Sequence, residues 1–371
     1  MSAATADAGH LWLAAGGTGG HVFPALALAA EARAAGWRTT LVGADGGPEA
    51  GWAAAADVRF LGLPAGKLDR ARPDPRALAR AVRGVAAGVA TLRRDRPDLV
   101  VGFGGFASLP AVAAAWLTRT PYVLHETNAF PGLVTRAFAR AAKVVVLTQP
   151  ETAPRLPRAR TAVVPLPVRE ERVPRHEARA ALGVPDEALL TLVMGGSQGS
   201  AYLNDAVPPI AARLQAERPE LWVLHQTGPR WRATVADAVG DRPRTLLEGF
   251  VDATVAFAAA DLAVTRGGYG TLADAAFHGV PLVVVPLPSS AEDHQRHNAE
   301  ALAAAGAGRC ATEGDADELE NAWRALLDPD QRAAAATAAR RRSPEGGARA
   351  LLATLTPLAR DPHRAPRRSR P

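Results

Sequence analysis

The chain has 371 residues, a formal net charge of +6 and a single cysteine. This length exceeds what one hydrophobic core normally supports, so two domains of about 150 to 180 residues are expected. One cysteine excludes an intramolecular disulfide framework and a cysteine-cluster metal site, and no apolar run reaches the ~18 residues of a membrane span. We therefore expect a cytoplasmic protein without a membrane span, whose positive charge favours nucleotides, nucleic acid or anionic lipid surfaces as partners.

The first half of the chain alternates short apolar runs with segments of helical periodicity. The apolar runs predict strands at residues 11–15, 39–42, 58–61, 99–101, 122–124 and 144–147. The periodic segments predict helices at residues 22–35, 76–96, 110–117 and 132–142. Proline, glycine and charged residues predict loops at 43–51 and 64–75 and a linker at 148–188. The domain boundary is expected near Pro165.

The second half alternates more regularly. Its predicted strands are residues 189–194, 221–226, 245–248, 262–265 and 282–286. Its predicted helices are residues 201–217, 230–239, 253–259, 270–278 and 292–305, followed by two more within 316–357. This alternation indicates α/β domains with a parallel sheet covered on both faces. We expect two domains, 1–165 and 166–358, and a disordered basic tail at 359–371.

Four glycine-rich turns follow predicted strands, and each leads into a helix. They lie at residues 16–20, 102–106, 195–200 and 267–270. Glycine lets the backbone turn sharply and approach a ligand, and a helix N-terminus favours a phosphate. Neither the first nor the third turn completes the G-x-G-x-x-G fingerprint, and the chain has no G-K-[ST] of a Walker A loop. These turns therefore predict phosphate sites that match neither common nucleotide motif.

Polar side chains stand beside several of these turns. His21 lies at a helix N-terminus, which disfavours imidazolium and leaves the ring able to accept a proton; the alternative is a histidine that only caps the helix. Glu126 and Asn128 follow another strand, and sites in parallel sheets form at the carboxyl ends of strands. Thr271 could donate to a phosphate and Asp274 could accept from a ribose, although an aspartate in a first turn is favourable without any ligand.

Two further patterns have competing interpretations. The helix at 76–96 carries one apolar stripe with arginines outside it; the stripe is Leu78, Val82, Val85, Val89 and Leu92. It could lie on an anionic membrane, but we favour packing on a sheet as the commoner cause of such a stripe. The H-x-x-H at 294–297 lacks a third ligand at suitable spacing, and the D-x-D at 315–317 suits an N-cap. We therefore expect no metal site.

Eight ordered stretches of this chain resemble the MurG family, the peptidoglycan N-acetylglucosaminyltransferases of glycosyltransferase family 28. They cover residues 16–29, 102–110, 125–133, 167–169, 195–200, 249–252, 265–275 and 293–299. The resemblance implies the GT-B fold, two Rossmann-like domains facing a central cleft, and a hexosyltransferase that uses UDP-GlcNAc. Phe106 stands where the family usually has tyrosine, and Asp274 where it usually has glutamate.

The resemblance also implies roles for individual residues. His21 would be the catalytic base, with Glu126 and Asn128 beside the reacting sugars. The residues implied in binding UDP-GlcNAc are Thr18, Gly19, Gly20, Asn128, Arg169, Ser197, Gln198, Val251, Gly270, Thr271, Asp274 and Gln295. The residues implied in binding the acceptor are Gly104, Gly105, Phe106 and Ser108.

The implied reaction transfers GlcNAc, with inversion, to the C4 hydroxyl of a lipid-linked N-acetylmuramoyl-pentapeptide in peptidoglycan synthesis, and so serves cell-wall biogenesis, cell shape and division. It would need neither metal nor cofactor. The protein would be peripheral on the cytoplasmic face of the cell membrane, with an anionic surface rather than nucleic acid as partner. The basic helices at 76–96 and 132–143 are the candidates for that contact. A GT-B enzyme with another acceptor, a UDP-GlcNAc epimerase and a non-catalytic nucleotide-sugar-binding protein are the alternatives.

Overall fold

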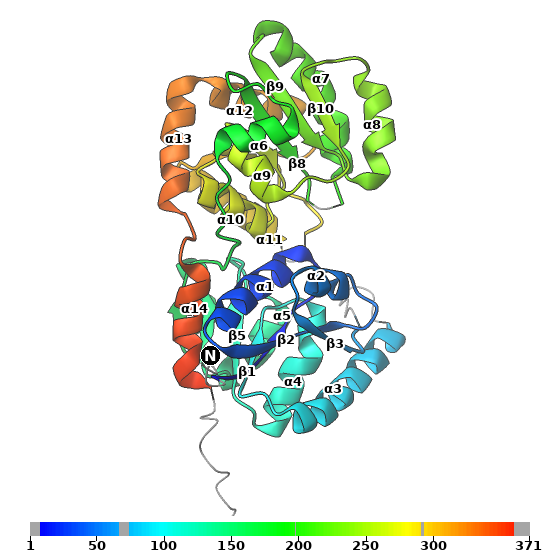
Figure 1. Cartoon of the computed structure of the whole chain (residues 1–371), viewed down its shortest axis with the longest axis vertical. Helices are drawn as coiled ribbons and strands as arrows, with labels where there is room; N and C mark the ends of the chain where they lie inside the picture. Colours follow the sequence, from blue (N-terminus) through cyan, green and yellow to red (C-terminus); the bar gives the residue numbers. More distant parts are fainter. Residues whose placement is uncertain (1–7, 67–73, 197, 291–292, 360–371) are drawn as a thin grey trace, which may run out of the picture. The chain divides into compact units, whose positions relative to one another are not determined.

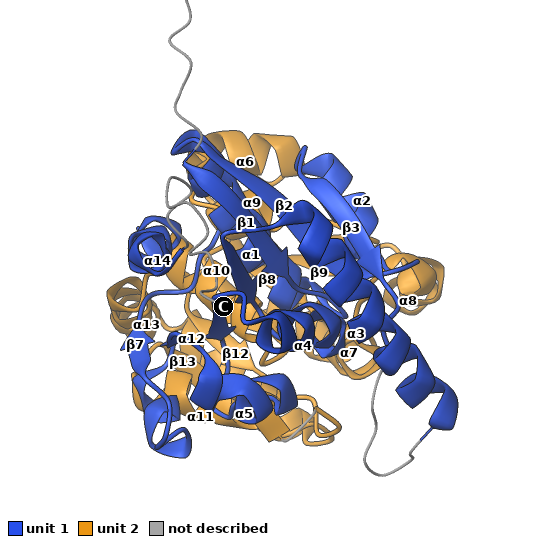
Figure 2. Ribbon diagram, turned by 90° about the horizontal axis from the view of Figure 1, so that it is seen from below, with its two compact units in different colours: residues 1–168, 346–371 blue, residues 169–345 orange. Residues whose placement is uncertain are grey.

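The computed structural model describes residues 8–66, 74–196, 198–290 and 293–359, which form two compact units. Unit 1 contains the described residues up to Val168 and from Gly346 onward, and unit 2 runs from Arg169 to Glu345 (Figure 2). The first crossing between units lies close to the boundary predicted at Pro165. Apart from residue 359, the predicted tail lies outside the described residues.

Unit 1 is built on a seven-stranded parallel sheet of order β3-β2-β1-β4-β5-β6-β7 (Figure 1). The strands are β1 (Gly9–Ala14), β2 (Trp37–Ala44), β3 (Arg59–Leu63), β4 (Leu99–Gly102), β5 (Tyr122–Glu126), β6 (Val145–Leu147) and β7 (Thr161–Val163). The helices are α1 (Gly19–Ala34), α2 (Glu49–Ala55), α3 (Pro75–Asp95), α4 (Leu109–Thr118), α5 (Leu133–Phe138) and α14 (Gly347–Leu355). Leu11 and Leu13 of β1 enter one core cluster, and Trp12 and Ala14 enter another, so both faces of the sheet are covered.

Unit 2 repeats this arrangement with six parallel strands in the order β10-β9-β8-β11-β12-β13. The strands are β8 (Leu189–Met194), β9 (Leu221–Gln226), β10 (Thr245–Glu248), β11 (Leu262–Thr265), β12 (Leu282–Val284) and β13 (Gly308–Cys310). The helices are α6 (Arg175–Leu182), α7 (Ala201–Glu217), α8 (Arg232–Val239), α9 (Ala253–Ala259), α10 (Tyr269–His278), α11 (His294–Ala304), α12 (Ala316–Leu327) and α13 (Pro329–Arg341). The predicted α/β class, two doubly wound parallel-sheet domains, is confirmed.

The C-terminal end of the predicted second domain belongs to unit 1 instead. Residues 316–357 hold three helices rather than the predicted two, and the last of them, α14, packs against α1. Leu351, Leu352 and Leu355 of α14 are buried in the core cluster of unit 1. The apolar face of α14 therefore completes the hydrophobic core of unit 1. Unit 1 is thus built from two separate segments of the chain.

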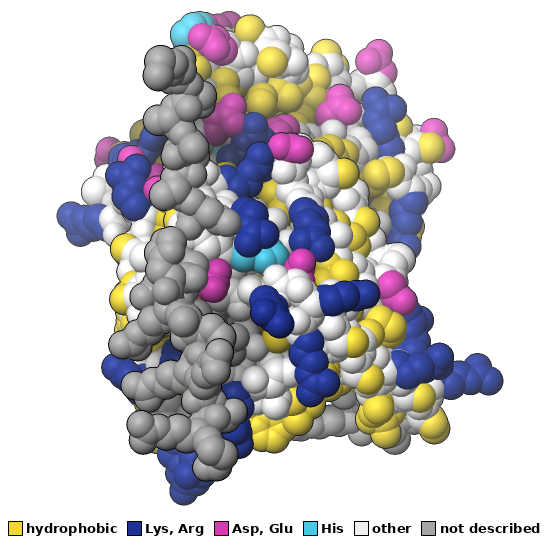
Figure 3. Space-filling model, turned by 60° about the horizontal axis from the view of Figure 1, so that its bottom comes forward, with side chains coloured by type: hydrophobic (Ala, Val, Ile, Leu, Met, Phe, Trp, Pro, Cys, Tyr) yellow, Lys and Arg dark blue, Asp and Glu magenta, His cyan; other side chains and the backbone are white. Residues whose placement is uncertain are grey.

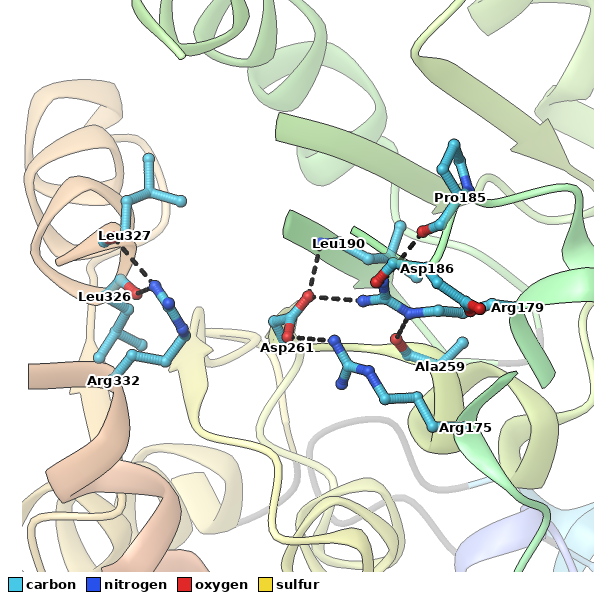
Figure 4. A network of polar contacts seen from close by, with 10 residues as sticks. All are labelled: Arg175, Arg179, Pro185, Asp186, Leu190, Ala259, Asp261, Leu326, Leu327 and Arg332. Atoms are coloured by element: carbon cyan, nitrogen blue, oxygen red, sulfur yellow. Dashed lines mark hydrogen bonds and ion pairs between the residues drawn. The ribbon is translucent and has the colours of Figure 1, made fainter. Parts of the chain in front are cut away.

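Among the described α-helices and strands, four lie where the sequence predicts loop or linker, or predicts nothing: α2, β7, α6 and β13. Tertiary contacts explain α6, whose Arg179 is fully buried. Arg179 donates to Oδ2 of Asp261 at 2.8 Å and to the carbonyl of Ala259 at 3.1 Å (Figure 4). Asp261 Oδ2 also accepts from the backbone N–H of Leu190 at 2.7 Å. The network attaches this short helix to the start of β8.

The prediction that the apolar stripe of α3 packs on the sheet is wrong for the first half of the helix. Leu78 and Val82 are 56% and 62% exposed. The buried face instead contains Ala81, Gly84, Gly88 and Leu92. A Cβ on Gly88 would lie 3.1 Å from the Cβ of Ala114 on α4, so the small residues permit a close approach of the two helices. Because α3 and α4 pack closely, the face of α3 with Gly84 and Gly88 is buried, and the bulkier Leu78 and Val82 remain at the surface.

Candidate functional site

In unit 1 the loops after β1 and β4 meet at the carboxyl ends of adjacent strands. The first loop runs from Gly16 into α1, with Thr18 as an extended N-cap residue. Its hydroxyl does not cap the helix but lies 3.1 Å from Nδ1 of His21. In the tautomer with the proton on Nδ1, Nδ1–H donates a hydrogen bond to the Thr18 hydroxyl and Nε2 carries the lone pair of a base. Thr18 and Gly20 are exposed, and Gly19 is partly exposed.

The glycine loop after β4 packs against the same histidine. A Cβ on Gly104 would lie 3.1 Å from Cδ2 of His21, and one on Gly105 would overlap the carbonyl oxygen of Gly16. Phe106 lies over Gly17, whose Cβ would be 2.9 Å from the phenyl ring. Ser108 is fully buried and donates to the Gly105 carbonyl at 2.8 Å, so its hydroxyl stabilises the loop. The predicted acceptor loop and the predicted base therefore lie together.

Glu126 has a different environment from the one expected of a group that contacts substrate. Its Oε1 accepts from the backbone N–H and the side-chain amide of Asn128 at 3.1 and 3.3 Å. Its Oε2 accepts from the N–H of Gly132 at 3.0 Å and the hydroxyl of Thr135 at 2.7 Å. Burial raises the pKa of Glu126, although these hydrogen bonds act to lower it. Both oxygens are engaged, so the geometry assigns Glu126 to fixing Asn128 and the start of α5.

His125, which the sequence groups with Glu126 and Asn128 at the end of a strand, is buried. His125 packs on Phe103 with ring centroids 5.0 Å apart, and neither ring nitrogen has a hydrogen-bond partner among the described residues. Burial, assisted by the charge of His21, lowers the pKa of His125 to about 3. His125 is therefore neutral and belongs to the apolar support beneath the loops.

In unit 2 the turn between β8 and α7 has the predicted strand–turn–helix form. Ser200 is the N-cap of α7, and its hydroxyl accepts from the N–H of Leu203 at 3.3 Å. It also accepts from Nε of Arg266 at 3.0 Å, and Gln226 donates to the carbonyl of Gly196 at 3.0 Å. Ser197 lies outside the described residues, and Gln198 is exposed. The hydrogen bond between Arg266 and Ser200 supports this turn. The two residues are far apart in the sequence, so the sequence does not predict this contact.

The loop before α10 places three predicted residues near one another. Gly270 and Thr271 occupy the first turn of α10, where backbone N–H groups lack intrahelical acceptors. Gln295 contacts the same loop, because its Oε1 accepts from the N–H of Gly267 at 3.1 Å and of Leu287 at 3.0 Å. The Gln295 side chain is thereby oriented, and its amide N–H groups remain the part suited to donate to a sugar hydroxyl.

Arg169 and Val251 lie beside Asp252, the N-cap of α9. Asp252 Oδ1 accepts from the N–H of Thr254 at 2.8 Å, and its Oδ2 lies 3.4 Å from Arg169. Arg169 also pairs with Glu171 and is exposed. Val251 is buried in the core of unit 2. A phosphate could replace these exposed carboxylate partners of Arg169, because exposed ion pairs contribute little free energy.

The titration of Asp274, on α10, can be tested experimentally. Burial, with the Asp252 carboxylate as the smaller cause, raises the pKa of Asp274 to about 7. The carboxyl of an unfolded chain titrates near ~3.9, so between those values the folded state binds the extra proton and the free energy of unfolding falls as pH rises. Asp274→Asn removes this titration. We expect its stability relative to the native chain to rise between pH 5 and pH 8.

Urea unfolding midpoints of both proteins at pH 5, 6, 7 and 8 measure this difference without any ligand. All other titrating groups are shared and cancel in the comparison. Parallel pH curves for the two proteins would show that Asp274 is ionised normally in the folded state.

Comparisons with known proteins agree with this geometry. The family models for the N-terminal and C-terminal domains of glycosyltransferase family 28 match residues 11–147 and 190–350. The chain is 46% identical to a Deinococcus radiodurans protein, the UDP-N-acetylglucosamine–N-acetylmuramyl-(pentapeptide) pyrophosphoryl-undecaprenol N-acetylglucosamine transferase, over 91% of this chain and 92% of that one. The chain belongs to glycosyltransferase family 28.

Other members of glycosyltransferase family 28 are similar over comparable lengths. A Thermus thermophilus protein of the same name is 44% identical, covering 92% of this chain and 98% of its own. The crystal structure of Acinetobacter baumannii MurG matches with a TM-score of 0.76 and 27% identity, covering 94% of this chain and 99% of that one. The GT-B class predicted from the sequence is confirmed. The roles of individual site residues remain predictions.

Proposed function

We propose that this protein transfers GlcNAc from UDP-GlcNAc to the C4 hydroxyl of a lipid-linked N-acetylmuramoyl-pentapeptide, forming a β-1,4 bond with inversion. The proposal is carried by the 46% identity over 91% of the chain to a relative named for that transfer. The grouping of Thr18, His21 and the 104–106 loop in unit 1 supports it, since this arrangement offers a base beside an acceptor loop. Unit 2 offers the loops for the nucleotide sugar.

The proposed chemistry follows from the side chains at hand. Nε2 of His21 removes the proton of the acceptor hydroxyl while its oxygen attacks C1 of GlcNAc. The bond from C1 to the diphosphate oxygen breaks, and UDP leaves with the electron pair. Thr18 orients the imidazole, and Glu126 holds Asn128 in place for the sugars. Atoms and charge balance when the base later releases its proton to water.

The leaving diphosphate needs positive potential, and the chain supplies it from its own groups. We assign this to the N-termini of α7 and α10 together with Arg169, which act as fixed dipoles and a cation. Asp274 then accepts from the ribose and Gln295 donates to the GlcNAc hydroxyls. On this assignment the transfer requires no metal ion.

UDP release from UDP-GlcNAc, measured with and without the lipid-linked acceptor and in the presence of EDTA, tests the transfer and its metal independence together. We expect acceptor-dependent release that EDTA leaves unchanged. Binding of UDP-GlcNAc without acceptor-dependent release would point to another acceptor or to epimerisation. Release abolished by EDTA and restored by a divalent cation would contradict the assignment of the diphosphate to helix N-termini and Arg169.

The acceptor's lipid stays in a membrane, so the enzyme must reach that surface. No helix among the described residues is long and apolar enough to cross a bilayer. Four large apolar side chains are exposed on the paired helices α3 and α4: Leu78, Val82, Trp116 and Leu117. Exposed arginines flank them at positions 76, 80, 83 and 119. Basic and apolar side chains are interspersed on the face that Figure 3 shows. We assign this surface of α3 and α4 to peripheral binding at the cytoplasmic face of the membrane.

Substituting Leu78 and Val82 together with aspartate should reduce sedimentation with vesicles that contain anionic lipid by at least about tenfold, because it removes apolar insertion and adds repulsion. Reversing the charge of Arg80 and Arg83 should weaken binding to anionic vesicles and spare the weak binding to neutral ones. The matched control is Val163→Asp, an exposed apolar residue on the edge strand β7 of the same unit. Equal sedimentation of all variants would exclude this surface.

A further inference from the structure

Glu49 is a buried acid that the proposed chemistry does not use. It is the first residue of α2, in a stretch whose sequence predicts a loop, and only 1% of it is exposed. Its Oε1 accepts from the backbone N–H of Gly17 at 2.6 Å. A hydrogen bond from a backbone N–H to a carboxylate is short and strong for its kind. Glu49 therefore fixes the turn that immediately precedes Thr18.

Three glycines enclose the Glu49 side chain. A Cβ on Gly16 or on Gly47 would overlap its carboxyl group, and one on Gly43 would lie 3.2 Å from its Cβ and Cγ. Gly16 lies in the loop after β1, Gly43 at the end of β2 and Gly47 in the loop after β2, and β1 and β2 are neighbouring strands. Close approach of backbone and side chain at three points makes a cradle shaped for a long acidic side chain.

The carboxyl group is not explained by packing alone. Its Oε2 is buried and has no hydrogen-bond partner among the described residues. A buried unpartnered oxygen costs stability, so an apolar side chain would fill the same volume more favourably. Buried polar atoms without a hydrogen-bond partner occur preferentially at functional sites. Among the described residues, the hydrogen bond of the carboxylate goes to the N–H of Gly17, next to the residue that contacts the proposed base.

Continuous contacts connect Glu49 to His21. Gly17 has a φ of 87° and is followed by Thr18, whose hydroxyl lies 3.1 Å from His21 Nδ1. On its other side, the His21 ring lies against the backbone of the loop at Gly104 and Gly105. The imidazole is thus held between two loops, and the position of the first loop depends on the Glu49 carboxylate.

We propose that Glu49 is a positioning residue for the transfer reaction, which fixes the Gly16–Gly17 turn and through it the orientation of Thr18 and His21. This inference rests on the proposed function for its kinetic consequence, but its structural part stands independently. A misplacement of about 1 Å at a reacting group can cost about 10²-fold in rate. Displacing the Glu49 carboxylate therefore lowers kcat, with a smaller effect on the KM for UDP-GlcNAc, because most of the residues proposed to bind this substrate lie in unit 2.

Three variants distinguish the role of the Glu49 carboxylate in catalysis from a general loss of folding. Glu49→Gln keeps an oxygen that accepts from Gly17, so it should retain kcat close to that of the native chain. Glu49→Asp is one methylene too short to reach Gly17, so kcat should fall by about 10²-fold. Gly47→Ala keeps the glutamate but displaces the far end of its flexible side chain, and it should lower kcat in the same direction. It serves as the test if Glu49→Asp does not fold. Glu31→Asp, the same change on α1 away from the loop, is the control.

Imidazole NMR provides a readout that does not depend on activity. The ring signals of His21 are identified by their loss in His21→Ala. They should shift in Glu49→Asp and Gly47→Ala and stay in place in Glu49→Gln and Glu31→Asp. Unmoved His21 signals in the folded Glu49→Asp and Gly47→Ala proteins, or an unchanged kcat in both, would overturn the proposal. Absence of acceptor-dependent UDP release in the native protein would instead refute the proposed function, and the NMR comparison would still decide the role of Glu49.

Discussion

Replacing His21 with alanine should lower kcat for acceptor-dependent UDP release by about 10²- to 10⁴-fold, the range typical for loss of a general base. The ring is held by the Thr18 hydroxyl at 3.1 Å and lies against the backbone of the acceptor loop. Most of the residues proposed to bind the nucleotide belong to unit 2, so the affinity for UDP should fall much less than kcat. Steady-state kinetics and calorimetric titration with UDP measure the two quantities separately.

A smaller change at the neighbouring residue tests how the base is oriented. Thr18→Val removes the hydroxyl that meets Nδ1 and keeps a β-branched side chain of similar shape, so kcat should fall by about tenfold, the value of one hydrogen bond. An unchanged kcat in His21→Ala would assign His21 to helix capping and favour a protein that binds the nucleotide sugar without transferring it. Equal loss of UDP affinity in that variant would mean that the substitution has disturbed the fold.

The sequence predicts best where one local signal dominates. The strand at Leu189–Met194 and the helix at Ala201–Glu217 match their predicted bounds, because a continuous apolar run meets a glycine turn and then a periodic segment. The glycine loops of the candidate site follow from the same reasoning. Glycine spacing also led to the family resemblance, which the comparisons confirm.

Tertiary contacts decide the elements that the sequence does not predict. The helix Glu49–Ala55 is too short to show a period, and the burial of its first residue depends on glycines from two loops. On α3 the sequence predicts one apolar stripe, and the close approach of α4 instead buries the face with Gly84 and Gly88. Similarly, the pattern at Glu126 indicates an acid at a strand end but cannot show that both its oxygens are engaged locally.

The helix α6 depends on a buried charge, and this dependence predicts a large effect on stability. Asp261→Ala should destabilise unit 2 by about 3 to 5 kcal/mol, because it leaves the fully buried Arg179 without its carboxylate. The same substitution removes the acceptor for the Leu190 N–H and the partner of Arg175 (Figure 4). The remaining bonds from Arg179 to backbone carbonyls engage Nε and Nη1, but they leave Nη2 without its Asp261 acceptor and do not neutralise the charge.

Urea unfolding of the full chain, together with hydrogen exchange of the peptide that contains Leu190, measures this loss in unit 2. Glu217→Ala is the matched control, since it breaks an exposed ion pair with Arg324 in the same unit and should leave the urea midpoint close to that of the native chain. Replacing Arg179 and Asp261 together with leucine and asparagine should recover part of the loss, because the uncompensated charge is then absent. If Asp261→Ala and Glu217→Ala unfold at the same urea concentration, the network does not hold α6 on the sheet, and the helix must be maintained by its apolar contacts alone.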